Sequence, residues 1–136
     1  MALVPDASVV IARALGEAHP DSLPVLARIE HDEWIVPALW WFEVRNALIV
    51  NERRRRLREH ETARILRDLS RVALTVDRSP DDATVMTLAR KHRLTVYDAA
   101  YLELALREGA ALATLDAALA EAASAEAVPL VGADAG

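Results

Sequence analysis

Short apolar runs alternate along this chain with longer segments in which apolar residues recur at helical spacing. This alternation is typical of a parallel sheet whose strands are joined by crossover helices. The sequence therefore predicts an α/β domain with a central parallel sheet of about five strands. The expected strands are Leu3–Val4, Trp34–Val36, Leu74–Val76, Thr95–Val96 and Ala111–Ala113. Val128–Val131 is compatible with one more short strand at the sheet edge, where Pro129 is tolerated.

Capping residues and glycines mark the helices between these runs. Asp6 or Ser8 is expected to cap the first helix, which Gly16 ends. Asp21 or Ser22 is expected to cap a second helix that contains Pro24, Leu26 and Ile29. The remaining helices are expected from about Ala38 into an arginine run, from Glu59 to Ser70, from Ser79–Asp82 to His92, from Asp98 to Glu108, and from Asp116 to Ala125. In the helix after Ala38, the expected buried stripe consists of Leu39, Phe42, Ala47 and Ile49.

The length of 136 residues fits one domain, and 53% hydrophobic residues are enough for a core. We expect a single domain over residues 1–131 and a loose tail at residues 132–136. The chain has no cysteine, which excludes disulfides and thiolate metal sites. Its first residues lack the pattern of a signal peptide, and no apolar run approaches the roughly 18 residues of a membrane span. We therefore expect a cytoplasmic protein.

The net charge of −5 is unevenly distributed. Between Arg53 and Arg71, eight arginines face only three acidic residues, so this segment is net +5. An acidic chain is a weak argument against a nucleic-acid partner, whereas a local basic strip is an argument for one. The arginines at the start of the strip are candidates for contacts with RNA phosphates: Arg53, Arg54, Arg55, Arg56 and Arg58. The alternative is a solvated helix end, where cations also favour the helix dipole.

Acidic residues occur at corresponding places in the predicted architecture. Asp6, Asp98 and Asp116 each stand just past a short apolar run. Glu43 lies about two helical turns into the segment that starts after Val36 and Pro37. Because the carboxyl ends of parallel strands lie together, these side chains are expected to converge on one crevice. Such a group of carboxylates needs cations, and Mg²⁺ or Mn²⁺ suits oxygen ligands best.

Each acid also has a simpler explanation. An aspartate between a strand and a helix is often only an N-cap, and a single helical glutamate is most often solvated. Glu43, however, stands in a stretch that is largely free of charge, where a buried carboxylate needs a partner. Capping and metal binding are compatible, because a helix N-terminus accepts anions. The joint pattern is therefore stronger than any one of its members.

Four segments that contain these acids resemble the acidic motifs of PIN-domain ribonucleases, and in particular those of VapC-type toxins of bacterial toxin–antitoxin pairs. The resemblance spans the whole chain in order, and it is most specific around Asp98 and Asp116. The segments are Val4–Ser8, Pro37–Leu48, Leu94–Leu102 and Leu112–Leu119. The resemblance implies a three-layer α/β/α fold and a Mg²⁺- or Mn²⁺-dependent endoribonuclease whose acidic quartet is Asp6, Glu43, Asp98 and Asp116. It also implies an RNA substrate, a cognate antitoxin and commonly a homodimer.

The chemistry of RNA cleavage suits such a site. A carboxylate-bound divalent ion activates a water molecule and polarises the phosphoryl group, and a second ion can stabilise the leaving oxygen. We expect Asp6, Asp98 and Asp116 to ligate the metal, with Glu43 either ligating it or orienting the attacking water. Further candidates for second-sphere or substrate contacts are Ser8, Asn46 and Thr114. Each of these residues also has a simpler interpretation: Ser8 as a helix cap, Asn46 as a solvated side chain and Thr114 as a half-buried strand residue.

Other classes of protein match the residues less well. A haloacid-dehalogenase-like phosphatase needs a second aspartate where this chain has Ser8. A receiver domain needs a lysine late in the sheet, whereas the one lysine, Lys91, falls near the end of a predicted helix. A catalytically inactive PIN-like scaffold that binds protein or RNA remains the alternative to the nuclease. Because no single stripe can bury Trp40, Trp41 and Phe42 together, one of these aromatic residues is expected to face a dimer or antitoxin surface.

Overall fold

The sheet is fully parallel, and its strand order is β3-β2-β1-β4. The computed structural model describes residues 2–16 and 33–131, to which all structural statements below refer. The strands are β1 (Ala2–Pro5), β2 (Glu33–Pro37), β3 (Leu74–Asp77) and β4 (Ala111–Ala113). In the register, Leu3 lies between Trp34 and Ala111, and Pro5 pairs with Ala113. The carboxyl ends of β1 and β4 therefore meet at one edge.

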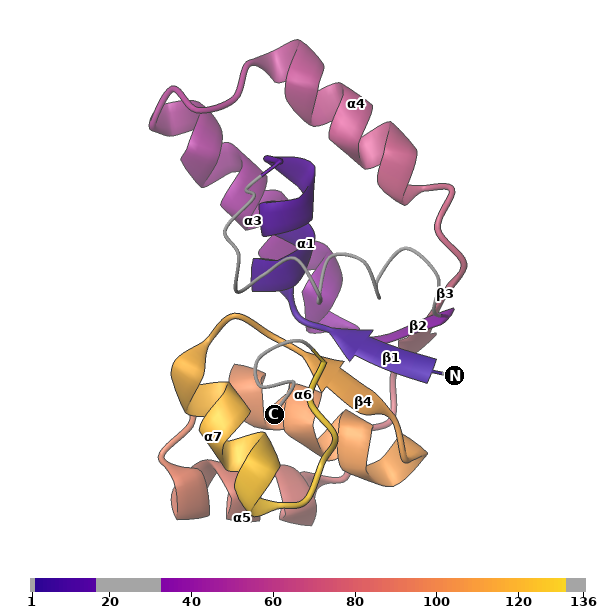
Figure 1. Ribbon diagram of the computed structural model, residues 1–136, viewed down its shortest axis with the longest axis vertical. Coiled ribbons are helices and arrows are strands. Elements are labelled where there is room, and N and C mark those ends of the chain that lie inside the picture. The colour runs from indigo at the N-terminus through magenta and orange to yellow at the C-terminus, as the bar shows by residue number, and fades with distance from the viewer. Residues whose placement is uncertain (1, 17–32, 132–136) are drawn as a thin grey trace.

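Helices cover both faces of this sheet. The helices are α1 (Ala7–Ala14), α3 (Leu39–Arg53), α4 (Glu59–Leu69), α5 (Asp82–His92), α6 (Val96–Glu108) and α7 (Ala117–Ala125). Figure 1 shows α1, α3 and α4 on one side of the strands and α5, α6 and α7 on the other. The three-layer α/β/α architecture expected from the sequence is thus confirmed. In the described ranges, no helix combines the length and the apolar character needed to cross a membrane.

The core lies where the two helical layers meet the strands. Leu3, Val4 and Leu112 are completely buried in β1 and β4. Burying a side chain of this size stabilises the fold by roughly 1.5–3 kcal/mol relative to leaving it exposed. Helix α6 is the most deeply inserted helix, because it packs on β1, β2 and β4 and buries seven consecutive residues from Ala99 to Ala105. Glu103 is the one charged residue in this buried stretch, whose other residues suit a position between the sheet and the neighbouring helices α5 and α7.

Local capping explains where most helices begin. Asp6 accepts a hydrogen bond from the Val9 N–H at the start of α1, so Asp6 rather than Ser8 is the cap. Asp81 and Asp116 cap α5 and α7 in the same way. Gly16 follows α1 with a φ of +66°, and Gly109 ends α6 with a φ of +61°. Both conformations favour glycine, which agrees with the predicted helix ends.

Two predicted strands are wrong. Thr95 and Val96 form no strand, because Thr95 caps α6 and accepts a hydrogen bond from the Asp98 N–H at 3.1 Å. Only Leu94 separates Arg93, the C-cap of α5, from this cap, which leaves no length for a strand. At Val128–Val131 the pairing is reduced to a single bridge between Leu112 and Leu130. The described residues therefore form four strands rather than about five.

The predicted buried stripe of α3 is also wrong. The helix buries Trp40, Val44, Leu48 and Asn51, whereas Phe42 is 68% exposed and Ile49 is 40% exposed. Leu39 and Ala47 are only partly buried against the core. Apolar residues occur on almost every side of this helix, so the sequence alone offers several stripes. The expected second helix at Asp21–Ile29 and the expected tail at residues 132–136 lie outside the described residues.

Candidate active site at the carboxyl edge of the sheet

Asp6 occupies the centre of the edge where β1 and β4 end. Its backbone N–H donates to the carbonyl of Ala113, and Asp6 is only 6% exposed. The Ser8 hydroxyl donates to Asp6 Oδ1 at 2.5 Å, and the Thr114 hydroxyl donates to Asp6 Oδ2. Each carboxylate oxygen is thus held by a neutral donor. A buried carboxylate with only neutral donors keeps a strong attraction for cations.

Ser8 and Thr114 also connect the two loops of this edge. The Ser8 hydroxyl accepts from the Leu115 N–H at 3.1 Å, and the Thr114 hydroxyl accepts from the Asp116 N–H at 3.0 Å. Thr114 is 1% exposed, so its hydroxyl is fixed by packing as well as by hydrogen bonds. The loop after β1 and the loop after β4 are therefore held in one arrangement around Asp6.

Glu43 reaches the same region from the other helical layer. It is the fifth residue of α3 and is partly buried. Its Oε1 accepts a hydrogen bond from the Tyr101 hydroxyl at 2.6 Å. Tyr101 belongs to α6, so this bond joins helices on opposite faces of the sheet at the carboxyl edge.

Asp98 and Asp116 complete the acidic group from two helix N-termini. Asp98 is the third residue of α6 and is partly buried, whereas Asp116 caps α7 and is exposed. Asp116 Oδ1 accepts from the Leu119 N–H at 2.9 Å. Asp98 is therefore not the helix cap that the sequence suggested, and its carboxylate is not used to start α6.

The pKa values of three of these acids, Asp6, Glu43 and Asp98, are raised, and the charge of Asp116 contributes to the rise at Asp98. Burial raises the pKa of Asp6 above its ordinary value, although the hydrogen bonds from Ser8 and Thr114 oppose the rise. Burial also raises the pKa of Glu43, and the charges of Asp98 and Asp6 add to the effect. Burial is also the main cause that raises the pKa of Asp98, and the charges of Asp116 and Asp6 contribute further. The structure thus brings together all four acids that the sequence singled out.

The donor chemistry of this edge fits a hard divalent cation. All candidate ligands are carboxylate oxygens, which Mg²⁺ and Mn²⁺ prefer. In residues 2–16 and 33–131, no three carboxylate or imidazole groups are close enough together to surround an ion as they stand. Binding therefore requires some side-chain movement, for which the exposed Asp116 has room. Mg²⁺ retains several waters in its sites, so incomplete protein ligation suits it.

The other candidate residues are exposed. Asn46 is exposed on α3. Arg53, Arg54, Arg55 and Arg56 are exposed at the end of α3 and in the turn that follows, and Arg58 is exposed next to α4. Ten residues of helix separate Glu43 from Arg53, which corresponds to about 15 Å. The arginines therefore do not contact the acids directly.

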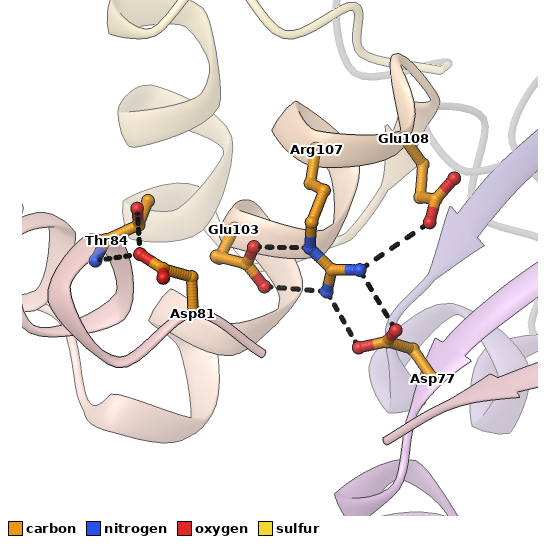
Figure 2. A network of polar contacts seen from close by, with 6 residues as sticks. All are labelled: Asp77, Asp81, Thr84, Glu103, Arg107 and Glu108. Carbon is orange, nitrogen blue, oxygen red and sulfur yellow. Dashed lines mark hydrogen bonds and ion pairs between the residues drawn. The ribbon is translucent and has the colours of Figure 1, made fainter. Parts of the chain in front are cut away.

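The sequence reasoning missed two polar contacts that involve α6. The first is the hydrogen bond of Tyr101 to Glu43, for which the spacing of three residues from Asp98 was the available signal. The second is a network around Arg107, which Figure 2 shows between Glu103, Asp77 and Glu108. Arg107 donates to both oxygens of Glu103 and to both oxygens of Asp77.

Comparison with known proteins agrees with this architecture. The profile of the PIN domain matches residues 3–125. Ribonuclease VapC3 of Pyrobaculum aerophilum is 39% identical over 126 residues, which are 89% of this chain and 94% of that protein. The crystal structure of PAE2754, also from Pyrobaculum aerophilum, superposes with a TM-score of 0.66 at 27% identity and covers 90% of this chain and 87% of that one.

The fold and the match over nearly the whole chain define the class: this protein belongs to the PIN-domain family. Within the family it is related to the VapC-type ribonucleases, as the similarity to Ribonuclease VapC3 shows.

Proposed function

We propose that this protein is a Mg²⁺- or Mn²⁺-dependent endoribonuclease and the toxin component of a cytoplasmic toxin–antitoxin pair. The observation that carries this proposal is the group of four carboxylates: burial and the charges of neighbouring acids raise the pKa values of Glu43 and Asp98, and no ion pair within residues 2–16 and 33–131 reaches the group. Such a group is costly to keep unless a metal ion compensates it. The relationship to Ribonuclease VapC3 supports RNA as the substrate.

In this proposal Asp6, Asp98 and Asp116 hold the metal. When bound, the ion supplies an activated water and polarises the scissile phosphate. Glu43 either ligates the ion or accepts the proton of the attacking water. Ser8 and Thr114 hold the Asp6 carboxylate in a fixed orientation, which is the usual task of residues behind a metal ligand. Asn46 remains a candidate for a substrate contact from the exposed surface of α3.

The arginines after α3 have a proposed role in RNA binding at a distance. They are Arg53, Arg54, Arg55, Arg56 and Arg58, all exposed. Because they lie about 15 Å from Glu43 along the helix, they would contact phosphates several nucleotides away from the cut. Their contribution is therefore to affinity and its salt dependence rather than to the chemical step.

The partners proposed for this protein are a second copy of the chain and an antitoxin. Trp41 and Phe42 are 52% and 68% exposed and pack edge to face at 5.0 Å. Both line a hollow of about 800 Å³ together with Leu39, Val76 and Pro80. An exposed apolar surface of this kind is typical of protein interfaces, and we assign it to the homodimer. The acidic edge suits a basic side chain of the antitoxin.

The dimer surface is tested by the oligomeric state in solution. Phe42→Lys should convert a dimer into a monomer in light-scattering measurements. Ile49→Lys is the matched control, since Ile49 is also exposed on α3 but lies outside the hollow. A monomeric wild-type protein, or a dimer unaffected by Phe42→Lys, would remove this assignment.

The nuclease is tested by incubating the purified protein with a mixed RNA pool in Mn²⁺, Mg²⁺ or EDTA. We expect cleavage with either metal, none in EDTA, and a loss of at least about a hundredfold in Asp98→Asn. Asp82→Asn is the matched control, because Asp82 is exposed in the first turn of α5. Unchanged cleavage by Asp98→Asn would refute the mechanism. Absence of both metal binding and cleavage would favour an inactive scaffold that binds protein or RNA.

A further inference from the structure

The two tyrosines of this chain lie four residues apart on α6 in contrasting environments. Tyr97 is 61% exposed, whereas Tyr101 is 1% exposed. The buried hydroxyl of Tyr101 donates to Glu43 Oε1 at 2.6 Å, across 58 positions of sequence. Buried tyrosines usually find a partner for their hydroxyl, but a backbone carbonyl would serve that need equally well. Here the partner is one of the four acids.

This contact constrains an otherwise mobile side chain. A glutamate has three rotatable bonds, and Glu43 is only partly buried. The Tyr101 ring is fixed by the core of α6, so its hydroxyl presents a donor at a defined position. The bond engages Oε1, and no side chain within residues 2–16 and 33–131 donates to Oε2. Because Tyr101 and Asp98 are three residues apart on one helix face, α6 places the hydroxyl and the Asp98 carboxylate together.

We propose that Tyr101 is a positioning residue that holds the Glu43 carboxylate toward the metal and the attacking water. This inference rests on the proposed nuclease function. Tyr101 itself donates one hydrogen bond and takes no part in the chemistry. Its effect passes through Glu43, so the inference predicts coupling between the two residues.

The central test compares Tyr101→Phe with Tyr97→Phe in the purified full chain. Mn²⁺ affinity is measured by titration calorimetry, and kcat and KM are measured on a defined RNA that the wild-type protein cuts. Loss of a residue that orients a ligand typically costs about tenfold or more in metal affinity or activity. We expect Tyr101→Phe to lose about tenfold in Mn²⁺ affinity and kcat with KM unchanged. Tyr97→Phe should match the wild-type protein.

A double variant separates positioning from general packing. On a Glu43→Ala background, Tyr101→Phe should cause no further loss of Mn²⁺ affinity, because the side chain that it orients is gone. An equal loss on both backgrounds would overturn the inference, as would wild-type affinity and kcat in Tyr101→Phe. If Tyr101→Phe does not fold, Glu43→Asp withdraws the carboxylate from the hydroxyl while keeping the charge. Wild-type Mn²⁺ affinity in Glu43→Asp would overturn the inference.

The failure of the nuclease proposal gives a different result. If the wild-type protein binds Mn²⁺ but cuts no RNA, the positioning role is decided by Mn²⁺ affinity alone. If it neither binds Mn²⁺ nor cuts RNA, both the nuclease and the positioning role are refuted. A tenfold weaker affinity in Tyr101→Phe, abolished on the Glu43→Ala background, would support the positioning role without the nuclease. An unchanged affinity would refute it.

Discussion

Two groups of acids in this protein differ in how their charge is compensated. Glu103 is 2% exposed, and Arg107 donates to both of its oxygens and to both oxygens of Asp77 (Figure 2). Asp6 is 6% exposed, yet its side-chain partners are the hydroxyls of Ser8 and Thr114 and one backbone N–H. Among the described residues, no ion pair reaches Asp6 or the three acids that surround it.

Under the proposed function, this difference separates acids with a structural role from acids that would bind a metal ion. The Arg107 network joins the end of β3 to α6 and provides its buried acid with a cation from the protein itself. Consistently, Arg107 holds the pKa of Asp77 below its ordinary value, whereas the pKa values of Asp6, Glu43 and Asp98 are raised. A carboxylate group that the protein leaves uncompensated is a candidate for metal binding. The four predictions below test this contrast.

The largest expected effect is on stability when the network loses its cation. Arg107→Ala should lower the free energy of unfolding by about 3 kcal/mol, because it leaves Glu103 buried and unpaired. This value is at the low end for a broken buried pair, since the Arg107 side chain is 32% exposed. Urea unfolding measures it, with the exposed Arg90→Ala as a control expected within about 0.5 kcal/mol of wild type. Equal effects of the two variants would contradict the role of the network.

The second prediction concerns addition of a metal ion to the acidic edge. Mn²⁺ at about a hundred times its Kd should raise the free energy of unfolding by about 2.7 kcal/mol. Asp98→Asn should lose most of this stabilisation, whereas Arg107→Ala should retain it despite its lower starting stability. Thermal unfolding with Mn²⁺ and with EDTA provides the measurement. Retention of the full gain in Asp98→Asn would place the ion elsewhere.

A third, smaller effect is expected from the same variant without metal. In EDTA at neutral pH, Asp98→Asn should raise the free energy of unfolding by less than about 1 kcal/mol, because it removes one of four repelling charges at a partly exposed position. Removing charge therefore stabilises this edge, whereas it destabilises the Arg107 network. A clear loss of stability in Asp98→Asn would mean that its carboxylate has a compensating partner after all.

The smallest predicted effect is the pH dependence of that gain. The pKa of Asp98 is raised in the folded protein above its ordinary value of 3.8. Between the ordinary pKa of Asp98 and its raised pKa in the folded protein, the folded state holds more protons than the unfolded state. The stability of the wild-type protein therefore falls as pH rises through this range. The advantage of Asp98→Asn should thus be complete at neutral pH and disappear as pH falls toward about 4. Urea unfolding of both proteins over this range in EDTA checks it, and a constant difference would contradict the repulsion.

The sequence was sufficient for features that depend on neighbouring residues. The strands at Leu3, Trp34, Leu74 and Ala111 were predicted from short apolar runs, and the structure has all four. The caps at Asp6, Asp81 and Asp116 follow from local hydrogen bonds within three residues. Since strand ends and helix starts fix where a side chain sits along the sheet, the gathering of the acids was also predictable.

The tertiary structure decided the features that depend on distant residues. Val96 and Tyr97 are apolar or aromatic and yet lie exposed in the first turn of α6. The choice of Trp40, Val44 and Leu48 as the buried stripe of α3 depends on how that helix meets α1 and the sheet. Several apolar stripes were available, and packing selected one.

The polar contacts show the same division. The bond of Tyr101 to Glu43 joins residues 58 positions apart, and that of Arg107 to Asp77 joins residues 30 positions apart. Sequence by itself determined which acids stand at the carboxyl edge, because local chemistry sets the ends of strands and helices. Only the tertiary structure decided which acids of the described residues form an ion pair within the protein, because charge pairing depends on which helices the fold brings together.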